Sequence, residues 1–513
     1  MLSYRLTIVK QLESRNTMKL SSKASIFAAT ALATSSYCKT EQPNIVFILA
    51  DDLGWQDVGF NGSNYFETPN LDKLAKQSVN FTNAYMYPTS SPSRAAIMTG
   101  RQSFRTQCYT VPALEKGNAQ DNLFSRWTVQ TKHKFYSQPL NEAGYKLIHL
   151  GKWHVVGPQP DAEKKYPFKK KLKSYSNGDI KWVSKHKKDY QQYYPLGRGY
   201  HENVGGTWWG DPARGWKKGY KDPKGGYIAP FKNPFIEDKE TDTWLTDRLT
   251  DDAIDFIKRN KKSPFFVNLH YYAPHRPSIP FSKETLKKYQ NKSDSSTGQN
   301  GKSTKEMAAY ATMVERLDQN VGRLISYLDQ SGLRENTIIV FTSDNGFNSY
   351  QSVSKNLRGN KGQIYEGGIK VPFLVNYSKF AKGKVSDEAV CGLDLFPTFL
   401  DFAGIRGNYK EQLDGKSIVP LLTQKTTSLN RPLFWQLSSN YKSQACSVIR
   451  RDGWKLIQFL KSGDLELYNL NNDPLESKNL AKQSPEKCQK LLQELTSWRA
   501  TNNVPLPPSS KVK

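Results

Sequence analysis

The chain has 513 residues, of which 37% are hydrophobic and 12% aromatic. These fractions allow more than one hydrophobic core, so they exclude a single small module and a chain that is disordered over most of its length. The formal net charge of +27 at pH 7 attracts polyanions at long range, which makes nucleic acid and acidic polysaccharide the two classes of partner to distinguish.

The N-terminal segment has the pattern of a secretion signal. A basic stretch that begins at Met18 precedes the small and apolar residues 24–34, which contain the A-x-A cleavage pattern of Ala31-Leu32-Ala33. We therefore expect a signal peptide over residues 1–33, with Met18 as an alternative start, and a short linker over residues 34–43. Neither this stretch nor any later one has the roughly 20 apolar residues of a transmembrane helix. Export argues against nucleic acid as the partner and favours an acidic or sulfated polysaccharide.

The cysteines are too far apart in the sequence to form a metal or redox motif. Four of the five lie beyond the expected linker without a C-x-x-C pair, and lone thiols are favoured over a disulfide. The fifth, Cys38, follows Ser35-Ser36-Tyr37, which is a poor lipobox, so a periplasmic or secreted protein is favoured over a lipid-anchored one. The other four are Cys108, Cys391, Cys446 and Cys488.

Two continuously apolar runs are predicted as strands that end in acidic residues. Residues 44–50 precede Asp51 and Asp52, and residues 337–343 precede Asp344. A run of this kind is typical of a strand that is buried on both faces and whose carboxyl end opens into a polar site. The two runs therefore predict a parallel sheet with ligands at its carboxyl edge.

Helical patterns lie between and after these strands. Thr68-Pro69 predicts a short helix through Lys76, and residues 305–329 form a long amphipathic stretch that Gly332 closes. Alternating helices and apolar strands indicate an α/β fold. We expect a catalytic domain over residues 44–404.

Two regions differ from the rest of the chain in composition or in hydrophobic pattern. About residues 157–240 form a basic and aromatic insertion, with ten lysines between Lys164 and Lys188. Beyond residue 404 the runs become short and alternating, as in 447–460, and a helical stretch follows at 485–500. We expect a smaller C-terminal α+β subdomain of antiparallel strands and a helix over residues 405–513.

The run Ser90-Ser91-Pro92-Ser93-Arg94 combines a helix start with a cation. Ser91 suits the N-cap and Pro92 the first helical position, which predicts a helix from Ser93 to about Thr99. A helix N-terminus beside Arg94 is a ready anion site. Taken alone, these five residues favour an ordinary helix cap.

The longer run Ser90-x-Pro-Ser-Arg-Ala-Ala-Ile-Met-Thr-Gly-Arg closely resembles the signature of type I, formylglycine-dependent sulfatases in its serine variant. This resemblance extends over most of the chain and implies an alkaline-phosphatase-like fold, with a large mixed sheet flanked by helices and a smaller C-terminal subdomain. The further motifs that match in order are Asn44 to Gly54, Gly144-Tyr145 to His154, Ala273-Pro274-His275-Arg276-Pro277, Ser343-Asp344-Asn345-Gly346, Gly362 to Pro372, and Glu466-Leu467-Tyr468-Asn469-Leu470 with Asp473-Pro474.

The resemblance implies that Ser90 is oxidised to formylglycine by a radical-type maturing enzyme. The hydrated aldehyde would offer two hydroxyls, one to attack sulfur and expel the alcohol, the other to eliminate sulfate. An unmodified serine would lack that exit. If Ser90 is never oxidised, the alternative is a non-catalytic glycan-binding protein.

Four polar residues are candidates to bind one divalent cation. Asp51, Asp52, Asp344 and Asn345 supply hard oxygen ligands, which suit Ca²⁺ or Mg²⁺ better than a metal that prefers sulfur or imidazole. Each pair alone could be a turn sequence. The resemblance adds the modified Ser90 as a ligand and favours Ca²⁺.

Five basic residues fall in the matched motifs. By its position Arg94 resembles the residue that steadies the formylglycine hydrate, and Lys152 and Lys361 resemble the lysines that contact the sulfate. His154 resembles the base that releases sulfate, and His275 the group that protonates or polarises the departing alcohol. Cations aimed at the leaving oxygen stabilise the transition state in preference to the ground state.

Substrate choice has to be inferred from residues outside these motifs. Trp208, Trp209 and Arg214 in the insertion, together with Arg276, suit stacking on sugar rings and pairing with acidic groups, although the tryptophans could equally pack under loops. With the net charge, they favour a sulfated poly- or oligosaccharide. The alternatives are an arylsulfatase of small substrates and a phosphate-ester hydrolase of the same superfamily.

Overall fold

The computed structural model describes residues 42–157, 179–212, 225–237, 241–292, 305–349, 351–352, 357–407 and 413–512. The expected signal peptide, Cys38 and Arg214 lie outside these ranges. Residues Gln42–Lys513 form one compact unit. No helix among the described residues combines the length and the apolar character that crossing a membrane requires.

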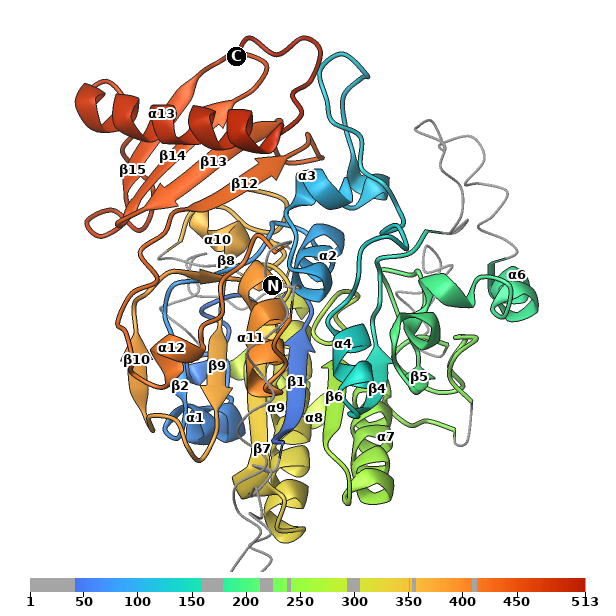
Figure 1. The fold of residues 1–513 in the computed structure, drawn as a ribbon. Helices are drawn as coiled ribbons and strands as arrows, with labels where there is room; N and C mark the ends of the chain where they lie inside the picture. Colours follow the sequence, from blue (N-terminus) through green and yellow to red (C-terminus); the bar gives the residue numbers. More distant parts are fainter. Residues whose placement is uncertain are drawn as a thin grey trace, which may run out of the picture. The chain divides into compact units, whose positions relative to one another are not determined.

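An eight-stranded mixed sheet forms the centre of this unit (Figure 1), as the resemblance implied. Its order is β10-β2-β9-β7-β1-β6-β4-β5, and β1 lies between β7 and β6 in parallel register with both. β9 runs antiparallel to β7 and β2. The strands are β1 (Asn44–Ala50), β2 (Val79–Phe81), β4 (Lys146–Gly151), β5 (Glu202–Val204), β6 (Phe265–His270), β7 (Thr337–Ser343), β9 (Phe373–Asn376) and β10 (Lys384–Ser386).

Both faces of this sheet are covered, which explains why its central strands are apolar throughout. In β1, Val46 and Ile48 face one core, which the helices α1, α7 and α9 complete. Ile45 and Phe47 face the other core, which α2, α4 and α11 complete. These helices are α1 (Pro69–Ala75), α2 (Ser90–Thr99), α4 (Ser137–Glu142), α7 (Leu245–Asn260), α9 (Lys305–Gln330) and α11 (Leu395–Phe402).

The C-terminal part is a four-stranded antiparallel sheet with α13 across one face (Figure 1). Leu456 and Leu467 pack against α13, whereas Val448 and Ile457 on the other face pack against Tyr85 of the short strand β3 (Ala84–Tyr85). The predicted strands and helix are confirmed, and β12 is an additional strand. The elements are β12 (Leu433–Leu437), β13 (Cys446–Arg451), β14 (Trp454–Phe459), β15 (Leu465–Asn469) and α13 (Pro485–Asn502).

Short elements connect these layers. A three-stranded sheet of order β11-β3-β8 lies within residues 84–391. The four cysteines beyond residue 41 are free thiols, as expected. The other strands and α-helices of the described residues are β3 (Ala84–Tyr85), β8 (Lys370–Val371), β11 (Val390–Cys391), α3 (Ser103–Thr106), α6 (Asp179–His186), α8 (Lys283–Asn291), α10 (Glu366–Ile369) and α12 (Val419–Leu422).

The helix α2 starts earlier than its sequence predicts. Thr89 is the N-cap in extended conformation, and Ser90 is the first helical residue, so the prediction that Ser91 caps the helix was wrong. Pro92 therefore occupies the third helical position. Its missing N–H is tolerated there because the first four N–H groups of a helix have no intrahelical partner.

Candidate active site

The carboxyl ends of β1 and β7 bring four polar side chains together. Ala50 and Ser343 are partners in the parallel register, so the residues that follow them meet at the same edge of the sheet. The backbone N–H of Asp52 donates to Oδ1 of Asp344 at 3.2 Å, and Nδ2 of Asn345 donates to Oδ1 of Asp52 at 2.7 Å. All four side chains, including Asp51, are fully buried.

Ser90 lies at the start of α2 with its hydroxyl directed into this group. Its Oγ lies 3.4 Å from Oδ1 of Asp51, 3.3 Å from Oδ1 of Asn345 and 3.3 Å from Nζ of Lys152. The hydroxyl therefore contacts residues that follow three different strands, β1, β7 and β4. The side chains that the sequence singled out around Ser90 do converge on it.

Two cations cross-link the carboxylates beside Ser90. Arg94 approaches Asp344 with Nη2 at 2.9 Å and Nε at 3.0 Å from the same oxygen, and its Nη1 donates to the carbonyl of Lys152 at 2.8 Å. Nζ of Lys152 lies 2.5 Å from Oδ2 of Asp51. Burial and repulsion by Asp344 raise the pKa of Asp51 to about 8.

The third cation, Lys361, comes from the loop before α10. Its Nζ lies 2.6 Å from Oδ1 of Asp52 and retains a side-chain exposure of 7%. Although burial opposes ionisation, the charge of Lys361 holds the pKa of Asp52 well below its usual range. The pKa of Lys361 rises above its usual value because the charge of Asp52 outweighs its own burial.

This charge balance fits a divalent cation. The three carboxylates of Asp51, Asp52 and Asp344 face three cationic side chains, so a divalent ion would leave the site positive and receptive to an anionic ester. The raised pKa of Asp51 shows that its ionised form is destabilised in the site, so a further positive charge nearby would stabilise it. Asp51, Asp52 and His275 also offer ligand atoms within 4.8 Å of one another.

His275 lies beside Asp52 at the border of the site. Its Nε2 is 3.7 Å from Oδ2 of Asp52, and its Nδ1 is 2.6 Å from the carbonyl of Arg276, to which a protonated Nδ1 donates. Burial and the charges of Lys152 and Lys361 lower its pKa well below the usual value. The neutral ring in this tautomer has Nε2 as an acceptor, so proton donation from Nε2 requires the imidazolium.

His154 has a constrained backbone and a neutral ring. Its φ of 56° lies in the left-handed region, and its ring packs on Gly210, where a Cβ would come within 2.7 Å of Cε1. Burial and the charge of Lys152 lower its pKa well below the usual value. Among the described residues no partner hydrogen-bonds its buried Nδ1. A neutral, partly unsatisfied imidazole is suited to accept a proton.

Two residues that no motif indicated also lie at the site. His270, the last residue of β6, has Nδ1 3.2 Å from Nη1 of Arg94 and 3.3 Å from the carbonyl of Lys152. Burial and the charge of Arg94 lower its pKa well below the usual value, and in the tautomer that is protonated at Nε2 the neutral ring accepts from Arg94. Asp211 has Oδ1 3.5 Å from Nδ1 of His275. The only sequence signal for His270 is that it ends a strand next to β1.

The residues predicted to contact the substrate differ in their exposure. Trp208 and Trp209 are 3% and 1% exposed and belong to the core, so the structure agrees with the packing interpretation and not with stacking on sugars. Arg276 is exposed beside His275. Arg214 lies outside the described residues.

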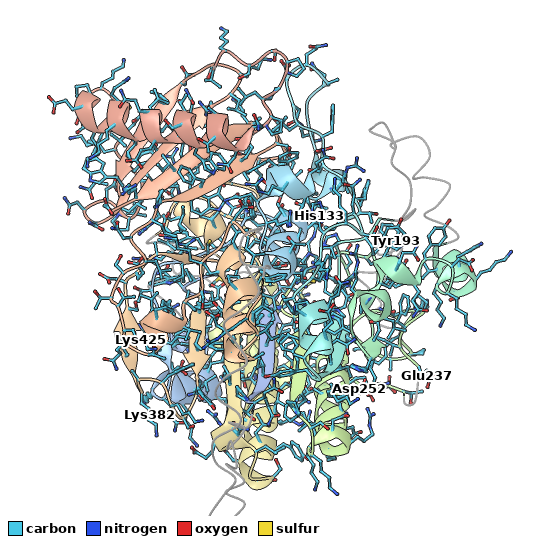
Figure 2. All side chains as sticks on the ribbon, viewed as in Figure 1. His133, Tyr193, Glu237, Asp252, Lys382 and Lys425 are labelled. Carbon is cyan, nitrogen blue, oxygen red and sulfur yellow. The ribbon has the colours of Figure 1, made fainter. Side chains whose placement is uncertain are left out.

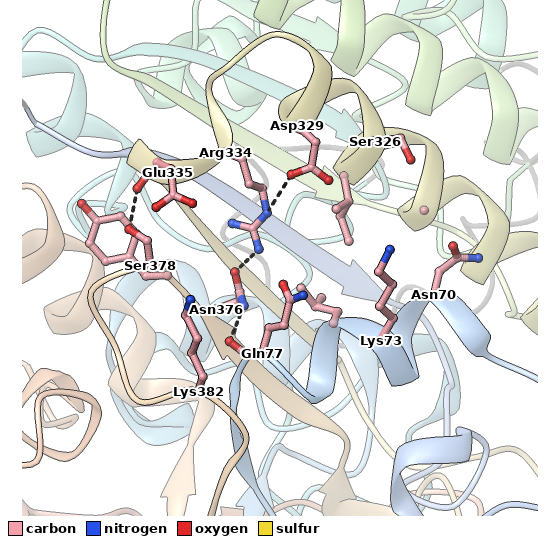
Figure 3. Close-up of a pocket in the computed structure, with 14 residues that line it drawn as sticks. Asn70, Lys73, Gln77, Ser326, Asp329, Arg334, Glu335, Asn376, Ser378 and Lys382 are labelled. Atoms are coloured by element: carbon pink, nitrogen blue, oxygen red, sulfur yellow. Dashed lines mark hydrogen bonds and ion pairs between the residues drawn. The ribbon is translucent and has the colours of Figure 1, made fainter.

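A separate pocket lies at the other end of β7 (Figure 3). Figure 3 shows Arg334 between Asp329 and Asn376, and Nδ2 of Asn376 donates to the carbonyl of Gln77 at 2.6 Å. Nε of Arg334 lies 3.8 Å from Oδ1 of Asp329. Several polar groups of this pocket thus bind one another, and none of the residues predicted for catalysis lines it.

The fold and the site together define a hydrolase of negatively charged esters. The chain belongs to the sulfatase family: the family model described as Sulfatase matches residues 43–405, and the model described as N-sulphoglucosamine sulphohydrolase, C-terminal, matches residues 359–501. It is therefore a sulfuric ester hydrolase.

Relatives cover most of the chain. A protein of Formosa agariphila named Sulfatase is 28% identical over 95% of both chains. The N-acetylgalactosamine-6-sulfatase of Sus scrofa is 30% identical over 81% of this chain and 72% of its own. The crystal structure of Ps i-CgsB in complex with k-i-k-neocarrahexaose has a TM-score of 0.68 and 31% identity, covering 92% of this chain and 95% of that chain.

Proposed function

We propose that this sulfatase removes sulfate from a sulfated poly- or oligosaccharide outside the cytoplasm, with a nucleophile made from Ser90. The observation that carries the proposal is the convergence of Asp51, Asn345 and Lys152 on the Oγ of Ser90. The names of relatives and of a solved complex, which refer to N-acetylgalactosamine and to neocarrahexaose, support a carbohydrate substrate. The net charge of +27 supports a polyanion.

The modification would occur at the Cβ of Ser90. A radical-type maturing enzyme would remove two hydrogens, and the hydrated aldehyde supplies one hydroxyl for attack on sulfur and a second for release of sulfate. Arg94 fixes this region by holding Asp344 and the backbone of Lys152. Lys152 and Lys361 place positive charge where sulfate oxygens gather in the transition state.

The histidines would move the protons. His154 is neutral and accepts the proton during release of sulfate. His275 orients its ring through the Arg276 carbonyl, and an incoming anion favours the imidazolium that donates to the leaving alcohol. Their separate environments support separate roles.

One Ca²⁺ ion, with Mg²⁺ as the alternative, would be held by the oxygens of Asp51, Asp52, Asp344 and Asn345 and by the modified Ser90. When bound, the ion would supply positive charge that favours the anionic sulfate ester. The burial of these oxygen ligands supports this assignment. The raised pKa of Asp51 supports it too, because the ionised carboxylate is stabilised by a further positive charge.

The test is mass spectrometry of the Ser90 peptide from the native host, combined with sulfate release from sulfated oligosaccharides. We expect a loss of two hydrogens at Ser90, and no turnover by Ser90→Ala. Ser91→Ala is the matched control, because Ser91 is the next buried residue of α2 and its side chain forms no hydrogen bond with the described residues of the site. Sulfate release that survives Ser90→Ala, or an intact serine in active protein, would refute the proposal.

A further inference from the structure

A loop of the C-terminal sheet reaches the catalytic loop that carries Lys361. This loop, residues 438–445 between β12 and β13, is held in place by Asn440, whose Nδ2 donates to the carbonyl of Gly362 at 2.9 Å. The hydroxyl of Tyr441 lies 3.4 Å from the carbonyl of Lys361. The ring of Tyr441 also lies against Gly362, where a Cβ would come within 3.3 Å of it. The loop is therefore fixed relative to the site.

Lys442 extends from this loop over the ring of Tyr441, with Nζ 5.2 Å from the ring centroid. Its Nζ donates to Oγ of Ser349 at 3.2 Å and to Oδ1 of Asn360. Both partners are neutral, and among the described residues no carboxylate forms an ion pair with Lys442. These hydrogen bonds hold the ammonium in one place without neutralising it.

The surroundings of Lys442 are positive. Burial and then the charge of Lys361 lower the pKa of Lys442 to about 8, with Arg276 acting in the same direction and Asp52 against it. Arg276 is exposed and forms no ion pair with a carboxylate in the part of the chain that the structure describes. A half-buried ammonium among other cations is costly unless an anion joins it. The fold therefore holds an ammonium group beside the catalytic residues without a counter-ion among the described residues.

We propose that Lys442, supported by Tyr441 and together with Arg276, binds a second anionic group of the carbohydrate, next to the sulfate ester that is hydrolysed. The inference rests on the proposed function for its substrate class. The anion can be a sulfate or a carboxylate, because both accept charge-assisted hydrogen bonds from an ammonium. The C-terminal sheet would thereby take part in substrate choice.

The test measures binding by calorimetry to full-length Ser90→Ala protein, so that turnover does not intervene. Three matched oligosaccharides share the reacting sulfate and carry a neighbouring sulfate, a carboxylate or a hydroxyl. We expect Lys442→Met to lower the ratio of charged to neutral affinity about tenfold, and Lys442→Arg to retain most of it. If Lys442→Met loses affinity for only one of the two charged oligosaccharides, that result identifies the anionic group that Lys442 binds.

Lys425→Met is the control, because it removes the same charge from an exposed lysine that follows α12 and is labelled at the left of Figure 2. It should leave the ratio unchanged. An unchanged ratio in Lys442→Met, or equal weakening of all three probes, would overturn the inference. Sulfate release by unsubstituted protein from the same compounds tests the proposed function separately, since the binding ratio does not depend on turnover.

Discussion

Arg94 and Asp344 are 250 positions apart in the sequence, yet Nη2 and Nε of Arg94 both lie within 3.0 Å of one oxygen of Asp344. The third guanidinium nitrogen donates to the backbone of Lys152, so one side chain joins α2 to the residues that follow β7 and β4. Only a planar group with donors in a fixed arrangement can make these contacts together.

Arg94→Lys should therefore reduce catalysis while the protein still folds. An ammonium keeps the charge but cannot reach Asp344 and the carbonyl of Lys152 together, so we expect kcat to fall by roughly 10²- to 10³-fold, the loss typical of removing one preorganised donor. Steady-state kinetics with a sulfate ester measures this. Arg105→Lys is the control, since Arg105 pairs with Asp414 at the surface. Equal activity of the two variants would contradict the prediction.

His270 should act as a positioning residue through Arg94. His270→Phe keeps the ring volume but removes the acceptor at Nδ1, which leaves one guanidinium donor unsatisfied. We expect a fall in kcat of roughly tenfold with a smaller change in KM, because the effect concerns geometry at the reacting group. A merely structural role would instead lower the melting temperature without separating kcat from KM.

The sequence predicted the site better than its surroundings. The apolar runs before Asp51 and Asp344 are informative because a strand that is buried on both faces is apolar at every position, and this pattern can be recognised without tertiary knowledge. The start of α2 was missed because Pro92 suits both the first and the third helical position. The burial of Trp209 depends on which loops pack over it, and no local pattern records that.

The position of Lys442 near Lys361 is a clearer example of a feature that the sequence could not predict. Lys442 lies before the alternating segment 447–460, where the sequence predicted no functional residue, and its chemistry arises only because this loop packs beside the catalytic loop. Long-range packing of this kind leaves no periodic signal. Residues that modify a shared site are therefore the ones that sequence reasoning finds least readily.

A divalent cation should stabilise the protein. Chelation should lower the melting temperature and abolish turnover, and Ca²⁺ at about 100 times its Kd should restore about 2.7 kcal/mol of stability. Asp51→Asn should lose this response because it removes a charged ligand. Asp57→Asn should keep it, since Asp57 is equally buried but bonds Tyr310 and Ser352. A melting temperature that ignores both chelator and Ca²⁺ would contradict the metal assignment.

Lys455 of β14 should stabilise the contact between the C-terminal sheet and the helix α10 in a pH-dependent way. Its buried Nζ lies 3.2 Å from Glu366 and 2.8 Å from Glu476, so Lys455→Met leaves two buried carboxylates without it and should cost about 3–5 kcal/mol. Burial already raises the pKa of Glu476 to about 7. A raised carboxyl pKa costs stability above that pKa and is relieved as the pH falls toward the unfolded value, so the deficit should shrink from pH 8 to pH 5. Urea unfolding at both pH values measures it, with the exposed Lys461→Met as control; a deficit independent of pH would refute the role of the carboxylates.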